Sequence, residues 1–356
     1  MTNNLNSEQP GGEPPIGEAE NAIELRAVEG KSQGRIVRER FFAHRGAIVG
    51  LIALILIMAL AMSSIGFGFL GWTIGGWWQW TPQETSALAL PGGRPTMTMP
   101  WSDAGFALGS HPFGQDTIGR DIFARTMKGV QTSLMIMVVV GSVVTVVGVV
   151  IGAVSGFYRK WIDTVLMRIT DLVITMPVIV VGAVLGKLVG GASPLPLALA
   201  LGAIVWTTVG RLVRGEFLSL REREFVDAAR VAGASDARII FKHILPNAMG
   251  VVIVAVTLLM SSAVLLETAL SYLGFGIHAP NVSLGTMISE YQSSFSTRPW
   301  LFWWPGVFII AVVLSVNFIG DGLRDAFDPR QKKLPSAREM AKADRRARER
   351  LEASAS

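Results

Sequence analysis

Residues 130–156 read VQTSLMIMVVVGSVVTVVGVVIGAVSG and contain no Asp, Glu, Lys or Arg. A transmembrane helix needs about 20 consecutive, mostly apolar residues, so this stretch is long enough to cross a bilayer. Its apolar residues follow one another without the strict alternation of a membrane β-strand. The stretch therefore predicts a transmembrane α-helix, in which the backbone polar groups are hydrogen-bonded within the helix itself.

Apolar intervals of similar character occur on both sides of this stretch. We expect spans at Ala47–Leu70, Leu172–Val189, Leu197–Val213, Met249–Leu266 and Trp300–Gly320. A Gly- and Pro-rich run at residues 190–196 predicts a turn between two of them. A buried core helix could explain any single interval. Six in one chain predict an all-α polytopic membrane protein with six transmembrane helices.

The composition excludes several classes of function. Half of the 356 residues are hydrophobic and 17% are charged, against about 25% charged in soluble domains. There is no Cys, and the four His are scattered, which argues against a thiolate nucleophile or a metal site. Gly66–Gly71 fits the GxGxxG pattern, but it follows an apolar span, so we reject a dinucleotide loop. Neither GxxxxGKS nor GxxxxGKT occurs, so we expect no ATP hydrolysis, no catalytic residue and no cofactor in this chain.

The placement of basic residues predicts the orientation. If both termini lie on one side, most of the 32 Lys and Arg lie on that side, which the positive-inside rule assigns to the cytoplasm. The net charge of +5 then needs no nucleic-acid partner. Residues 1–34 are predicted to be a disordered acidic tail, and 322–356 a charged cytoplasmic tail. Residues 35–71 combine a basic juxtamembrane segment with the first span. Residues 35–45 either lie along the lipid headgroups or only anchor this span, and we favour the anchor.

Two external connections are long enough to matter for function. Residues 72–129 hold Trp72, Trp77, Trp78, Trp80 and Trp101. Trp prefers the membrane interface, so we interpret these residues as anchors, with substrate stacking as the less favoured alternative. The connection at residues 273–299 is a candidate surface for an external partner.

The cytoplasmic loop at residues 214–248 carries a helical pattern of its own. Ser219 and Glu222 match a capping box, and Gly233 suits a helix end. We therefore predict a helix over 219–234, with small residues in its later half and one apolar side chain, Phe225. A second short helix can begin at Ser235. A helix this polar has no reason to enter lipid, so it either docks on a cytoplasmic partner or is a solvated connection.

This loop resembles the EAA loop of ABC-importer permeases, whose pattern ends in a Leu-Pro pair. The matching positions here are Asp227, Ala228, Ala229, Gly233, His243, Leu245 and Pro246. Three other segments are similar to the oligopeptide/dipeptide/nickel branch of that family: FGQDTIGRDIFAR at 113–125, ETALSYLGFG at 267–276 and NFIGDGLRDAFDP at 317–329. Gln115 stands where the branch usually has Thr. The four segments occur in the expected order, and the resemblance covers about residues 40–329.

The resemblance implies a type I ABC-importer transmembrane domain in residues 130–321, in a bacterial inner membrane. It implies a second homologous permease, two ATPase subunits or one fused ATPase, and an external solute-binding protein. Peptides would be the substrate, membrane lipids would surround the spans, and ATP and Mg would bind only the ATPases. The residues implied in ATPase coupling are Glu222, Phe225, Asp227, Ala228, Ala229, Gly233, Leu245 and Pro246. A self-sufficient secondary transporter or channel, or a membrane scaffold, is the alternative.

Acidic residues at the ends of spans are candidates for a role in the pathway. Glu267, Asp171 and Asp321 occupy such positions. Interfacial placement with water contact is the simpler interpretation of each, and Glu267 is the strongest pathway candidate, since it could meet a peptide ammonium group. Gly141, Gly148, Gly152 and Gly156 predict close helix packing in the second span rather than a ligand site.

Overall fold

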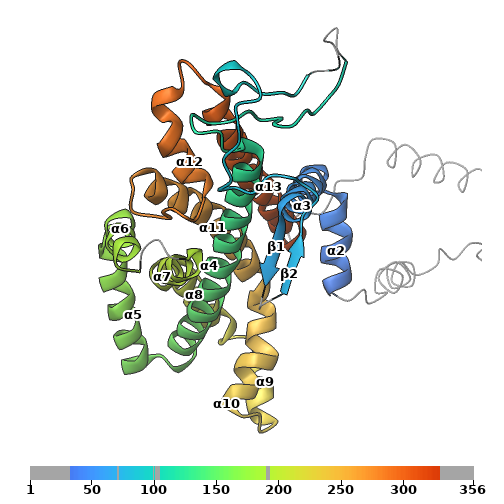
Figure 1. Cartoon of the computed structure of the whole chain (residues 1–356). Coiled ribbons are helices and arrows are strands. Elements are labelled where there is room, and N and C mark those ends of the chain that lie inside the picture. The colour runs from blue at the N-terminus through green and yellow to red at the C-terminus, as the bar shows by residue number, and fades with distance from the viewer. Residues whose placement is uncertain (1–32, 70–71, 99, 101–104, 190–192, 329–356) are drawn as a thin grey trace, which may run out of the picture.

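The computed structural model describes residues 33–69, 72–98, 100, 105–189 and 193–328. Of the two predicted tails, only residues 33–34 and 322–328 are described. Trp101 lies outside the described residues. Within the described residues the chain is predominantly helical (Figure 1). Two ends of the molecule can be told apart. The "α9 end" carries the short helices α9 (Glu224–Val231) and α10 (Asp236–Arg238), and the "α12 end" carries α12 (Leu284–Tyr291) (Figure 1).

Four helices of the described chain are long and apolar enough to cross a membrane unaided. They are α3 (Arg45–Ile65), α4 (Ile122–Tyr158), the continuous helix Asp236–Tyr272 that ends in α11 (Leu245–Tyr272), and α13 (Trp300–Phe327). Within Asp236–Tyr272, residues Ile239–Ile244 form a π-helical segment between α10 and α11.

Two bent helix pairs supply the remaining apolar length. The pair α5 (Lys160–Thr175) and α6 (Val178–Val189) is bent by 85°, and the pair α7 (Pro194–Val205) and α8 (Thr207–Leu220) by 43°. If each pair is one crossing, the described residues hold six candidate spans, as predicted. The break after α5 has a local cause, because Pro177 disfavours the helical conformation at the preceding residue, and Met176 is extended (φ −80°, ψ 127°).

The helix bounds differ from the prediction at the first two spans. The first helix ends at Ile65 rather than Leu70, because Gly66 takes a positive φ of 71° and starts a hairpin. Its strands are β1 (Gly66–Phe69) and β2 (Trp72–Gly75), paired antiparallel. The GxGxxG pattern thus belongs largely to this hairpin. The second helix begins at Ile122, eight residues earlier than expected, since Asp121 accepts a hydrogen bond from the Ala124 amide at 2.8 Å and caps it.

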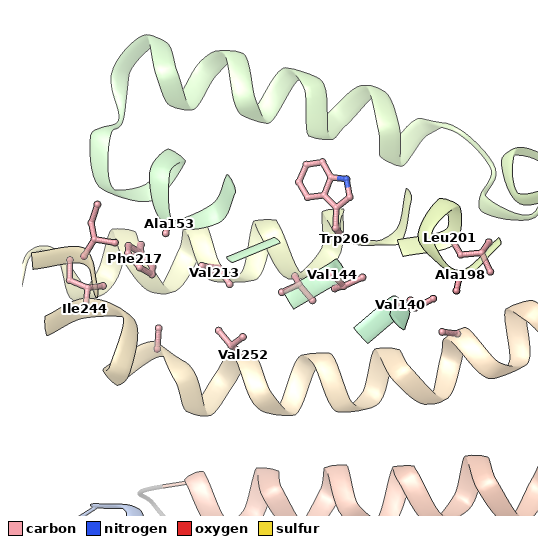
Figure 2. Packing of buried hydrophobic residues seen from close by; sticks show 14 of the residues in the cluster. Val140, Val144, Ala153, Ala198, Leu201, Trp206, Val213, Phe217, Ile244 and Val252 are labelled. Carbon is pink, nitrogen blue, oxygen red and sulfur yellow. The ribbon is translucent and has the colours of Figure 1, made fainter. Parts of the chain in front are cut away.

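The main hydrophobic core lies where α4, α7, α8 and α11 meet (Figure 2). Glycines in α4 allow α8 to pack close to it, as the sequence predicts. A Cβ at Gly152 would lie 2.7 Å from the Val213 Cβ, and one at Gly156 would lie 2.6 Å from the Phe217 Cβ. A second apolar cluster includes Phe113, Ile122, Leu284 and Leu301 and joins α4 to the α12 end. Helix α2 (Gln33–Ala43) packs beside α13.

Candidate coupling segment and transport groove

The predicted helix over 219–234 is divided in two by the structure. Helix α8 runs on to Leu220, so Ser219 lies inside α8, and the capping-box prediction is wrong. Helix α9 begins at Glu224, and its N-cap residue, Arg223, makes no side-chain capping hydrogen bond. The Glu222 carboxylate instead forms an ion pair with the Arg159 guanidinium at 2.7 Å.

The end of α9 follows the prediction. Gly233 takes φ 77°, a left-handed conformation that glycine adopts without strain. Its amide donates to the Arg230 carbonyl at 2.9 Å, and the Ala234 amide donates to the Ala229 carbonyl at 3.0 Å. Ser235 then caps α10 by accepting from the Arg238 amide at 3.4 Å. The two short helices are thus set at a fixed angle by a glycine turn and a serine cap.

Apolar side chains are exposed around α9. Val231 is 90% exposed, Phe241 65% and Phe225 39%, whereas Val226 is fully buried and anchors α9 to the core. Ala228 is exposed and Ala229 half-buried, and the neighbouring Asp227 carboxylate pairs with Arg230 at 3.1 Å. Three large apolar side chains are thus exposed in and near a helix that also carries charged residues.

Polar contacts tie α8 and the residue after it, Arg221, to the end of α4 and the start of α5. The Arg214 guanidinium donates two hydrogen bonds to the Asp163 carboxylate, at 2.6 and 2.7 Å, and Ser155 donates to the same carboxylate. Arg221 donates to the Phe157 carbonyl. A bidentate Arg–carboxylate pair fixes relative orientation as well as distance. Together with the glycine contacts of α4, these bonds make α8 and the α4–α5 turn one unit.

The link from α9 to α11 is continuous helix rather than a break at the Leu-Pro pair. Leu245 is half-buried and Pro246 exposed, both in the first turn of α11. Because the helix runs unbroken from Asp236 to Tyr272, a displacement of α10 passes directly into α11.

Two cavities lie along one side of α11. The larger, of about 630 Å³, is lined by α5, α6, α7, α8 and α11 and includes Thr207, Thr208 and Ser262. The smaller, of about 400 Å³, is lined by α8, α11 and the last turn of α13. Ala255 and Leu258 line both cavities. The two cavities are therefore neighbours along α11, and we call them together the α11 groove.

None of the three acidic candidates lines either cavity. Asp171 forms an ion pair with Arg211, and Asp321 is exposed on α13. Glu267 is fully buried, in contrast to the simpler expectation of water contact, and its carboxyl accepts a hydrogen bond from Ser271 at 2.7 Å. Ser271 in turn accepts from the Ile277 amide at 3.0 Å, so Glu267 holds the loop that follows α11.

The segment FGQDTIGRDIFAR folds into a buried polar network at the α12 end. The Asp116 carboxylate accepts from the amides of Ile118 and Arg120, at 3.0 and 2.8 Å, and from the Tyr291 hydroxyl at 3.1 Å. Arg120 also pairs with Glu290 of α12, as does Arg125 at 2.6 Å. Burial raises the pKa of the Tyr291 hydroxyl, so this hydroxyl stays protonated and donates.

A second part of this network surrounds the start of α4. The Asp121 carboxylate contacts His111 Nδ1 at 2.8 Å and accepts from the Trp78 indole at 2.9 Å. Burial raises the pKa of the Asp121 carboxyl, and the hydrogen bonds from Ala124, His111 and Trp78 oppose that shift. The Trp80 ring stacks on His111, and its indole donates to the Ser110 carbonyl at 3.0 Å.

Trp78 and Trp80 are half-buried, and their indoles donate to groups within this segment; their interpretation as membrane anchors stays a prediction. Sequence reasoning did not single out His111, Glu290 or Tyr291. No motif marks them: the partners of Glu290 and Tyr291 lie in a distant part of the chain, and the spacing of His111 and Asp121 fits no pattern considered above. Within the described residues, no group of three or more His, Asp or Glu side chains is arranged to hold a metal ion.

The apolar helices define a helical, multi-pass membrane protein, and comparison with known proteins gives the family. Residues 148–333 match the model of the "binding-protein-dependent transport system inner membrane component" family. The chain belongs to this family, and is a multi-pass membrane protein.

Curated relatives cover nearly the whole chain. The oligopeptide transport system permease protein OppC of Mycobacterium tuberculosis is 35% identical over 314 residues, 86% of this chain and 98% of that protein. A putative peptide permease protein of Brucella suis is 37% identical, over 82% of this chain and 89% of its own length. Haemophilus influenzae OppC is 33% identical, over 87% and 93%. Among solved structures, a chain of the inward-facing MetNI methionine ABC transporter is 20% identical with a TM-score of 0.46, covering 56% of this chain and 94% of that chain.

Proposed function

We propose that the chain is a permease subunit of an ATP-driven importer of oligopeptides or dipeptides, and that it forms half of the translocation pathway. The observation that carries this proposal is the 35% identity to an oligopeptide permease over 98% of that protein's length. Relatives from three genera that match over most of their length all carry peptide-permease names. ATP hydrolysis takes place in partner subunits, and this chain is not catalytic.

Helix α9 and its surroundings are the ATPase-coupling segment. The exposed Phe225, Val231 and Phe241 provide apolar side chains for a groove on a cytoplasmic ATPase. The small Ala228 and Ala229, and the turn at Gly233, allow that partner to come close. Movement of α9 reaches α4 and α5 through the Asp163–Arg214 bonds and reaches α11 through unbroken helix. Such rigid transmission suits gating by rocking of packed helices.

The orientation follows from this assignment. The α9 end and both termini face the cytoplasm, and the α12 end faces outside. There the network that joins residues 113–125 to α12 offers a fixed surface to a solute-binding protein. The α11 groove is open along one side, and a second, homologous permease completes it.

The test is ATP-dependent uptake by the assembled transporter. The chain is coexpressed with a second permease, the ATPases and the binding protein of its own operon, purified as a complex, and placed in lipid vesicles. We expect peptide-stimulated ATP hydrolysis and uptake that require all components. Uptake or exchange by this chain alone without ATP would instead support a secondary transporter or channel, and would overturn the proposal.

A further inference from the structure

The α11 groove has an uneven distribution of charge. The larger cavity is lined by apolar side chains and by the hydroxyls of Thr207, Thr208 and Ser262, with no charged residue among its lining residues. The smaller cavity is also apolar, except at its end, where Arg324 and Asp328 line it. A solute moving along this wall therefore meets its first charged groups on this chain at that end of the groove.

Arg324 is placed to receive an anion there. Arg324 lies in the last turn of α13, is exposed, and lines the smaller cavity. Among the described residues, its guanidinium has no hydrogen-bond or ion-pair partner. A guanidinium offers two parallel N–H donors that match a carboxylate.

We propose that Arg324 is the exit subsite for the C-terminal carboxylate of the transported peptide. This inference rests on the proposed function, which places this end of the groove at the cytoplasm. The uncharged wall before it cannot distinguish peptides by side-chain charge, so the terminal carboxylate, which all unmodified peptides share, is the group that Arg324 recognises.

An anionic lipid headgroup is the other anion that could reach Arg324, but the rest of the groove favours the peptide. The groove continues past Ala255 and Leu258 into a cavity lined by the hydroxyl-bearing residues Thr207, Thr208 and Ser262. A peptide backbone can hydrogen-bond to such hydroxyls, whereas lipid tails cannot.

The experiment measures uptake into vesicles that contain the fully assembled transporter. Two peptides are compared that differ only in a free or an amidated C-terminus. For each peptide, uptake by the Arg324→Gln variant is divided by uptake by the unmodified transporter, so any preference of the binding protein cancels. Arg324→Lys keeps the charge. Arg38→Gln is the matched control, because it removes an exposed basic residue of α2 that lines neither cavity.

We expect Arg324→Gln to lower uptake of the free-acid peptide about two- to fivefold, the range for an exposed ion pair. Uptake of the amide should not change, Arg324→Lys should restore most of the loss, and added salt should reduce the difference. Arg38→Gln should affect neither peptide.

Three outcomes would overturn the inference. Equal losses for both peptides, or no loss for either, would show that Arg324 does not read the terminus. A loss that follows the anionic lipid content of the vesicles, and not the peptide terminus, would assign Arg324 to a headgroup. If the unmodified transporter imports neither peptide, the proposed function fails and this inference with it. The inference alone fails when import is normal and the variants do not discriminate.

Discussion

The two ends of the molecule handle charge in opposite ways. At the α12 end, the His111 and Asp121 side chains of one pair are 2% and 1% exposed. At the α9 end, the Arg159 and Glu222 side chains are 40% and 63% exposed, and apolar residues such as Val231 are exposed as well. The α12 end thus buries the polar pair that lies at the start of α4. The α9 end leaves apolar surface uncovered, which is the character of a surface that a partner completes.

This contrast predicts different costs for removing a charge at each end. A buried ion pair that loses one partner leaves an uncompensated buried group, whereas an exposed pair contributes little. Mutations at the α12 end should therefore act on stability. Those at the α9 end should act mainly on transport.

The largest effect is expected for Asp121→Ala. The change leaves His111, the Trp78 indole and the Ala124 amide without their shared acceptor, and should lower the free energy of unfolding by about 3–5 kcal/mol. Thermal unfolding of the purified chain in detergent measures it. Asp171→Ala, which breaks an exposed pair with Arg211, is the control, and similar losses in the two variants would contradict the contrast.

A smaller effect is expected for Gly156→Ala, where α4 meets α8. The added Cβ would lie 2.6 Å from the Phe217 Cβ and 2.8 Å from the Arg214 carbonyl oxygen, so the helices must separate, at about 1–3 kcal/mol. Gly215→Ala in α8 is the matched control, because no atom lies within 4 Å of its added Cβ. Unfolding temperatures should fall only for the first variant. An unchanged value there would mean that the contact is not tight.

Gly233→Asp should separate stability from transport. The positive φ at this position costs a non-glycine residue about 1–2 kcal/mol, but no atom crowds the added Cβ, so the chain should still fold and insert. Peptide uptake and copurification of the ATPases should be lost. Ala229→Glu should do the same through bulk and charge. Normal uptake in both variants would refute the assignment of α9 to coupling.

The smallest effect is expected for the Arg159–Glu222 pair. Arg159→Glu or Glu222→Arg alone should cost about 0.2–1 kcal/mol, and the double reversal should recover it. A double-mutant cycle on unfolding free energies, repeated at high salt, measures the coupling. If the coupling energy of this exposed pair were as large as the loss of unfolding free energy in Asp121→Ala, the two ends would not differ in the way proposed.

The spans were predictable because a bilayer requires long segments without charge. The positions where helices break or end were harder to predict. The break at Met176 had a readable cause in Pro177. The capping box at Ser219 and Glu222 matched its pattern, yet α8 continues through it because Phe217 is buried against α4. Tertiary packing overrode a local signal there.

Buried polar contacts were the hardest feature to predict. Asp116, Arg120 and Arg125 stood in a recognisable segment, but their partners Glu290 and Tyr291 lie more than 160 residues away in the chain. The simpler interpretation placed Glu267 at the membrane interface in contact with water, but the residue is fully buried. No local pattern records such pairings, because they depend on how the helices are brought together.

The π-helical segment Ile239–Ile244 has a geometric consequence for the groove. A π-helical turn holds one residue more than an α-helical turn, and one residue corresponds to about 100° of rotation. Every residue of α11 beyond it is turned by that amount relative to a plain helix. Ala255 and Leu258 face the groove only with this rotational offset in place. The π-helical segment beside α10 thus determines which face of α11 lines the groove. If this segment changed to plain α-helix, α11 would rotate about its own axis without bending.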